Sequence, residues 1–124
     1  MVDATEVRLV LDGLLGIDRP KIICLVGSSR FILHYATLAW ELEKRGAITL
    51  GLHLLPKEYT SEPIPGHLAE YEGVADRMDQ LHLRKIDLAD EVMVLNIGGY
   101  IGESTRREIK YAESLGKPVS YVEE

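Results

Sequence analysis

The chain has 124 residues, 46% of them hydrophobic, and a formal net charge of −6 at pH 7, which suits one domain with a buried core. This acidic balance argues against a wide basic face, so we expect neither a DNA or RNA polymer nor a membrane surface as a partner. The single cysteine, Cys24, excludes an internal disulfide and a cysteine-based metal site, and we expect no metal. Residues 1–16 contain early acidic residues and no long apolar run, which argues against a signal peptide or a membrane span and predicts a cytoplasmic protein.

Residues 1–20 are expected to form an N-terminal extension with a short helix, and residues 21–124 to form the domain. Residues 21–26 (KIICLV) predict the first strand, because an apolar run of this length is typical of a strand buried on both faces of a parallel sheet. A helix is expected over 31–45, and Gly46 follows its last turn, where glycine commonly ends a helix.

The first strand is followed by Gly27, Ser28, Ser29 and Arg30. Small residues and an arginine at the carboxyl end of a strand can wrap a phosphate, so all four are candidate ligand-binding residues. The motif is short, and a tight turn in which Ser28 or Ser29 caps the following helix explains it nearly as well.

The middle of the chain predicts a second strand over 47–52 and then a long loop over 56–65, where prolines gather. A loop of this length in a small domain often covers a site. A helix is expected over 67–88. Its apolar stripe, expected to pack on the sheet or on a partner subunit, comprises Val74, Met78 and Leu81.

The rest of the chain is organised around a third strand at 91–96, a glycine-rich loop, a helix at 104–115 and a fourth strand at 118–122. The pattern predicts an α/β fold: a small, doubly wound, flavodoxin-like or Rossmann-like parallel sheet with strand order about 2-1-3-4, flanked by helices. This order places the loops after strands one and three at the topological switch point, where such folds bind ligands. The candidate ligand-binding residues of the second loop are Asn96, Gly98, Gly99, Gly102, Ser104 and Thr105.

Two side chains on the predicted helices are candidates for catalysis. Glu108 lies near the start of the last helix, where the helix dipole stabilises a carboxylate. The alternative is structural, because Thr105 and Glu108 have the spacing of a capping box. His82 is a candidate general acid or base, although a lone histidine on a helix is more often structural or exposed.

The segment ADEVMVLNIGGYIGESTRREIKYAESLGKPV, residues 89–119, resembles the carboxyl half of the nucleoside 2-deoxyribosyltransferase superfamily, which includes small nucleoside 5′-monophosphate N-glycosidases. The family pattern is an acidic residue before a hydrophobic strand, a glycine-containing loop, and a helix written roughly E-[IL]-G-x-A-x-x-x-G-K-P-V. Here the helix reads EIKYA at 108–112 and GKPV at 116–119. The chain departs from the pattern near Cys24, where the family carries tyrosine, near His82, where it carries aspartate, and at Lys110, where it carries glycine.

The resemblance implies that the ligand is a nucleoside or a nucleoside 5′-monophosphate and that Glu108 is the catalytic carboxylate, as in a retaining glycosidase. The expected function is hydrolysis or transfer at the N-glycosidic bond, and the departures argue against transfer. We expect no cofactor, and the resemblance also implies a homodimer or larger assembly. The alternatives are a nucleotide-binding or sensing module without turnover and an interaction protein whose loops are only structural.

Overall fold

A computed structural model describes residues 3–14, 19–51 and 72–124 of the chain. Its centre is a four-stranded, all-parallel sheet in the order β2-β1-β3-β4, which confirms the predicted α/β fold and strand order. The strands are β1 (Ile22–Gly27), β2 (Ile48–Leu50), β3 (Glu91–Leu95) and β4 (Val119–Tyr121).

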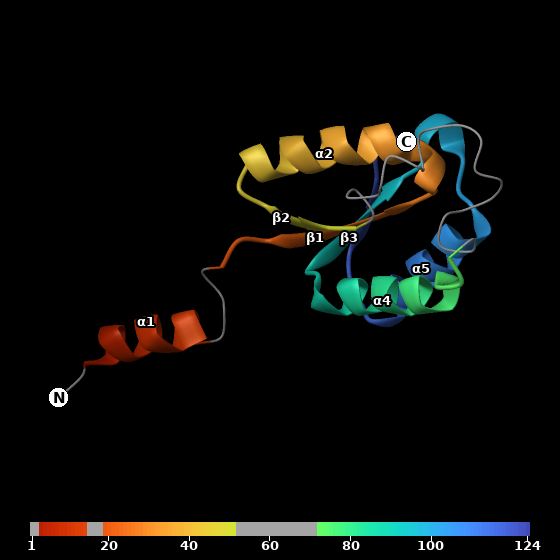
Figure 1. The fold of residues 1–124 in the computed structure, drawn as a ribbon. Coiled ribbons are helices and arrows are strands. Elements are labelled where there is room, and N and C mark those ends of the chain that lie inside the picture. The colour runs from red at the N-terminus through yellow and green to blue at the C-terminus, as the bar shows by residue number, and fades with distance from the viewer. Residues whose placement is uncertain (1–2, 15–18, 52–71) are drawn as a thin grey trace.

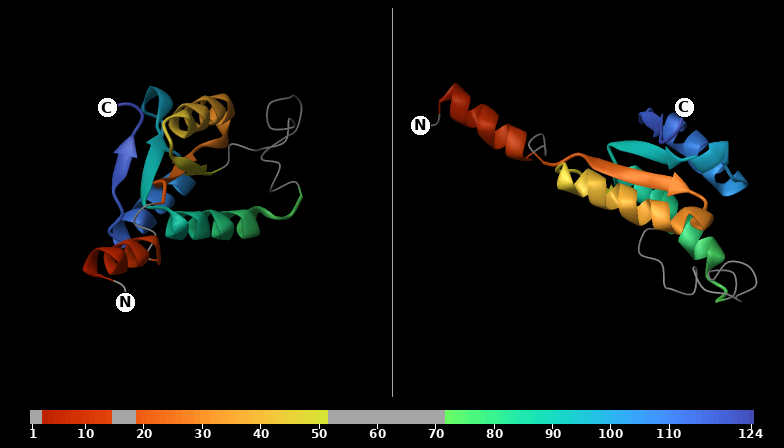
Figure 2. Two further views of the ribbon diagram at one scale, coloured as in Figure 1. Left: turned by 90° about the vertical axis from the view of Figure 1, so that its left-hand side faces the viewer. Right: turned by 90° about the horizontal axis from the view of Figure 1, so that it is seen from above.

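Helices cover both faces of the sheet. Helix α2 (Ile32–Lys44) lies on one face, and α4 (Ala75–Leu88) and α5 (Glu103–Ser114) lie on the other (Figure 1). Helix α1 (Ala4–Leu14) confirms the short N-terminal helix, and Figure 1 and the right-hand view of Figure 2 show it standing apart from this body. Within the described ranges, no helix is long and apolar enough to cross a membrane.

The sheet separates two hydrophobic cores, because successive side chains of a strand point to opposite faces. Ile23 and Leu25 of β1 pack under α2, whereas Cys24 and Val26 face α4 and α5. The α2 side is completed by buried Phe31, Tyr35, Ala39 and Leu95. The other core is completed by buried Ile86, Ala89, Val92, Val94, Ile109 and Ala112.

The helix expected over 67–88 begins only at Ala75, because Gly73 has a φ of 74°, which ends regular helical geometry there. The apolar stripe predicted for this helix is also wrong as a sheet-facing surface, since Met78 and Leu81 are 38% and 49% exposed. The buried positions are His82 and Ile86. The predicted loop over 56–65 and the start of the predicted helix lie outside the described residues.

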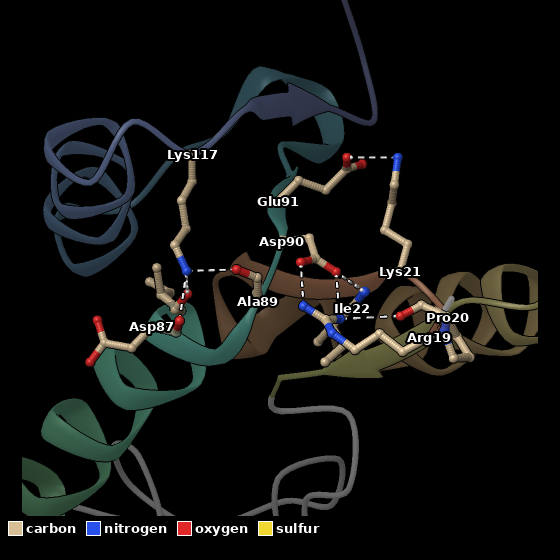
Figure 3. Close-up of polar contacts among 10 residues, drawn as sticks. Arg19, Pro20, Lys21, Ile22, Asp87, Ala89, Asp90, Glu91 and Lys117 are labelled. Carbon is tan, nitrogen blue, oxygen red and sulfur yellow. Dashed lines mark hydrogen bonds and ion pairs between the residues drawn. The ribbon is translucent and has the colours of Figure 1, made fainter. Parts of the chain in front are cut away.

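Asp90 ties the start of β1 to the start of β3. Its carboxylate accepts two hydrogen bonds from the Arg19 guanidinium, at 2.7 and 2.9 Å, and one from the Ile22 backbone N–H at 2.8 Å (Figure 3). Lys21 and Glu91 form an ion pair beside it at 3.2 Å. The family-like acidic residue before the third strand is therefore explained by a structural contact.

These contacts predict a pH-dependent contribution to stability. The hydrogen bonds from Arg19 and Ile22 hold the pKa of Asp90 below its usual value, so the folded state prefers the ionised form. The stabilisation is present above the unfolded carboxyl pKa, about 4, and is lost as the pH falls through the lower folded value. We expect Asp90→Asn to lower the free energy of unfolding slightly at pH 7 and to have no effect at pH 2–3, measured by urea unfolding. A difference that does not change with pH would contradict this assignment.

Candidate functional site

Helices α4 and α5 lie side by side and run in the same direction beneath the sheet (Figure 1). Near the carboxyl-terminal end of α4, Asp87 accepts a hydrogen bond from the Tyr111 hydroxyl at 2.5 Å. Arg84 donates to the same hydroxyl at 3.0 Å and forms an ion pair with Asp87 at 2.9 Å. This network joins the two helices at one end.

Toward their amino-terminal ends, the two helices enclose a cleft of about 360 Å³. Each helix contributes residues at the spacing i, i+3, i+4 and i+7, which places them on one helix face. One wall comes from α4 and the other from α5. The lining residues are Asp76, Asp79, Gln80, Leu83, Ser104, Arg107, Glu108 and Tyr111.

Glu108 faces His82 across the two helices. Glu108 Oε2 and His82 Nε2 lie 2.6 Å apart, and the side chains are 17% and 6% exposed. The angle between the groups is not that of a hydrogen bond, so both ring nitrogens of His82 and Glu108 Oε2 are buried without a hydrogen-bond partner among the described residues. Buried polar atoms are rarely left unpaired, which marks this pair as unusual.

The carboxylate of Glu108 affects two buried groups nearby. Burial, and then the negative charge of Glu108, raise the pKa of the Cys24 thiol to about 12. The same two causes raise the pKa of the Tyr35 phenol well above its usual value. Cys24 is therefore a neutral core residue, and the Glu108 side chain, 17% exposed, lies close enough to influence it.

Glu108 is not half of a capping box. The N-cap of α5 is Gly102, which makes no side-chain capping bond, so Thr105, the predicted cap, lies inside the helix. Thr105 is 2% exposed and packs inward. The charge of Glu108 thus faces His82 and the cleft, and the capping interpretation is wrong.

The loops after β1 and β3 lie next to each other, as the strand order requires. The Arg30 guanidinium stacks over the Tyr100 ring at 3.8 Å, and Phe31 packs edge-on against the same ring. Ser28 caps the short 3₁₀ helix η1 (Ser29–Phe31) by accepting a hydrogen bond from the Arg30 N–H, whereas α2 has Phe31 as its N-cap and no side-chain capping bond. None of these residues lines the α4–α5 cleft.

Gly27 is required by close packing. A Cβ at this position would lie 3.0 Å from both Leu95 Cβ and the Leu95 carbonyl oxygen, and 3.2 Å from the Tyr35 hydroxyl. That hydroxyl donates to the Gly27 carbonyl at 2.7 Å. The glycine therefore lets α2 and β3 approach the end of β1.

The loop after β3 makes its polar contacts within the chain. Both atoms of the Asn96 amide bond to the backbone of Glu123, each at 2.9 Å. The Gly98 N–H donates to the Glu123 carboxylate at 2.9 Å. Gly98 and Gly99 have positive φ values of 66° and 80° in the short 3₁₀ helix η3 (Ile97–Gly99), a conformation that glycine adopts without strain.

Of the predicted site residues, only Ser104 and Glu108 line the cleft, with His82 behind Glu108. The sequence analysis missed three lining residues: Asp76, Asp79 and Tyr111. Each lies four residues from another lining residue on its own helix, namely Gln80, Leu83 and Arg107, and this spacing indicates a shared helix face. In the described part of the chain, no three His, Cys, Asp or Glu side chains gather in a way that could hold a metal ion.

A scan against protein-family models gives no match, and no curated protein matches the sequence significantly. The structure shows an α/β fold with a parallel sheet, and the resemblance to the deoxyribosyltransferase superfamily stays a prediction from motifs.

Proposed function

We propose that the chain binds a nucleoside or a nucleoside 5′-monophosphate in the α4–α5 cleft and hydrolyses its N-glycosidic bond with the help of Glu108. The observation that carries the proposal is the placement of Glu108, whose carboxylate lines a cleft of about 360 Å³ while one of its oxygens lies against buried His82. A cleft of this volume lies at the lower end of the range for small-molecule sites.

The proposed reaction breaks the bond between the sugar C1′ and the base nitrogen. The electron pair leaves with the base, and positive charge develops on the sugar. Glu108 meets that charge, either through the field of its carboxylate or by bonding to C1′. A water oxygen then bonds to C1′, which breaks the C1′–Glu108 bond where one has formed and restores the carboxylate, and the proton that the water loses goes to the departed base.

His82 is a positioning residue in this scheme. Both of its ring nitrogens are buried, so they do not face the cleft. The imidazole therefore acts through Glu108, by fixing the carboxylate against α4, and not by giving a proton to the base.

A phosphate could be recognised at the mouth of the cleft. The Arg107 guanidinium donates to the Ser104 hydroxyl at 3.2 Å, which holds a positive charge near the first turn of α5. That turn also supplies backbone N–H groups, and a helix amino terminus favours anions. These features favour a nucleoside 5′-monophosphate over an uncharged nucleoside.

The test is a panel of ribo- and deoxyribonucleosides and their 5′-monophosphates incubated with the purified chain. We expect release of free base from at least one class, detected by chromatography, together with a raised melting temperature in its presence. Neither base release nor thermal stabilisation with any compound would overturn the proposal.

The second candidate is a nucleotide-binding or sensing module without turnover. The contact between the Glu108 and His82 side chains favours it, because a carboxylate oxygen that lies 2.6 Å from buried His82 Nε2 is less available to a developing positive charge on a sugar. Ligand-induced thermal stabilisation without base release would select this candidate.

The phosphate contact gives a separate prediction. Ser104→Asp places a negative charge beside Arg107, so it should weaken binding of a 5′-monophosphate about tenfold more than binding of its nucleoside, about 1.4 kcal/mol of like-charge repulsion. Ser104→Asn, which has nearly the same shape and no charge, is the control and should treat both ligands alike. Calorimetric titration measures both affinities. Equal weakening of the two ligands by Ser104→Asp would place the phosphate elsewhere.

A further inference from the structure

Helix α1 carries an apolar stripe that nothing in the described chain covers. Val7, Val10, Leu11 and Leu14 have the spacing i, i+3, i+4 and i+7, so they share one helix face, and each is between 44% and 78% exposed. The helix stands away from the sheet and its covering helices (Figure 1 and the right-hand view of Figure 2). An isolated helix of 11 residues is marginal in water, so this face needs a partner.

Helix α2 presents a matching stripe on the side away from the sheet. Leu33 and Trp40 are 73% and 66% exposed, and Ala36 and Thr37, both exposed, lie between them at the same helical spacing. The two large side chains, Leu33 and Trp40, lie two turns apart, with the two small ones between them. The stripe of α1 has the same length, with Val10 and Leu11 at its centre.

Charges at the ends of the two stripes set their relative direction. Asp3 continues the α1 stripe one turn before Val7, and Lys44 continues the α2 stripe one turn after Trp40. Antiparallel packing brings these opposite charges together and also opposes the two helix dipoles. Lys44 already forms an ion pair with Glu41 at 2.9 Å. An exposed ion pair of this kind contributes little to stability, so Lys44 can contact Asp3 instead.

We propose that α1 of one copy packs antiparallel on the outer face of α2 of a second copy, in a reciprocal two-fold exchange. Packing on its own α2 in this direction is out of reach. Arg19 is fixed near the carboxyl-terminal end of α2, and the five residues from Leu14 to Arg19 span at most about 17 Å. In antiparallel packing Leu14 would have to lie beside Leu33. That position is about 17 Å along α2 from its carboxyl-terminal end and one interhelical distance, about 9 Å, to the side, which is farther than the five residues can span.

Sedimentation velocity of the full chain tests the assembly. The wild type should sediment as a dimer, and Leu11→Glu and Trp40→Glu should each weaken dimerisation at least tenfold, because each buries a charge in the contact. Leu9→Glu is the matched control: Leu9 is also exposed on α1, at 64%, but lies off the stripe, so this variant should remain a dimer. Circular dichroism of all three variants verifies that the fold is retained.

Cysteine pairing tests the geometry. Wild-type Cys24 is fully buried, so it does not interfere. A Leu11→Cys chain mixed with an Ala36→Cys chain should form a disulfide-linked heterodimer on mild oxidation, whereas Leu11→Cys mixed with Leu81→Cys on the outer face of α4 should not. A wild type that is monomeric at all concentrations would overturn the proposal. Pairing of Leu11→Cys with itself or with Leu81→Cys would overturn it too.

Discussion

A Glu108→Gln variant should lose base release by at least about a thousandfold, equivalent to about 4 kcal/mol of transition-state stabilisation, while its melting temperature stays close to that of the wild type. Glutamine keeps the shape of the side chain but removes the charge that faces the sugar. Its amide can still contact His82, so the packing between α4 and α5 is preserved. Because α5 begins at Glu103 with Gly102 as its N-cap, no cap is lost.

The control for this variant is Glu103→Gln, which removes the same charge from an exposed position in the first turn of α5. It should leave base release within about twofold of wild type. Both quantities, melting temperature and initial rate of base release, are measured on the same samples. Undiminished base release from Glu108→Gln would remove this carboxylate from the mechanism and leave only the binding function.

The sheet could be predicted from the sequence because its signal is local. The apolar run of β1 and the run at 91–95, each ending in glycine or small polar residues, indicate strands buried on both faces, and the structure confirms both. The strand order then follows from right-handed crossovers between parallel strands. The start of α4 was missed because a single glycine, Gly73, decides it, and the residues before 72 lie outside the described chain.

The candidate site depends on how two helices are rotated about their axes, which residue types alone do not fix. His82 was recognised as a candidate without a partner, and only the packing of α4 against α5 brings it to Glu108. Asn96 and Gly98 were predicted to bind ligand, but Glu123 near the carboxyl terminus takes their hydrogen bonds. A contact between segments so distant in sequence leaves no local pattern.

Lys117 belongs to the GKPV motif, and the structure gives it a role in folding. Its ammonium group donates to three carbonyl oxygens at the end of α4: those of Ile86 at 2.8 Å, Asp87 at 2.7 Å and Ala89 at 2.6 Å (Figure 3). The last carbonyls of a helix have no partner within the helix, and a cation there also complements the helix dipole. Lys117 therefore ends α4 and connects it to the turn before β4.

Replacing Lys117 with methionine should lower the free energy of unfolding by about 2–3 kcal/mol. Methionine keeps the apolar part of the side chain but removes the charged donor from the carbonyls of Ile86 and Ala89, two residues whose side chains are buried. Lys110→Met, at an exposed position of α5, is the matched control and should change stability by less than about 0.5 kcal/mol. Urea unfolding followed by circular dichroism measures both. Equal stability of the two variants would mean that water satisfies these carbonyls as well as Lys117 does.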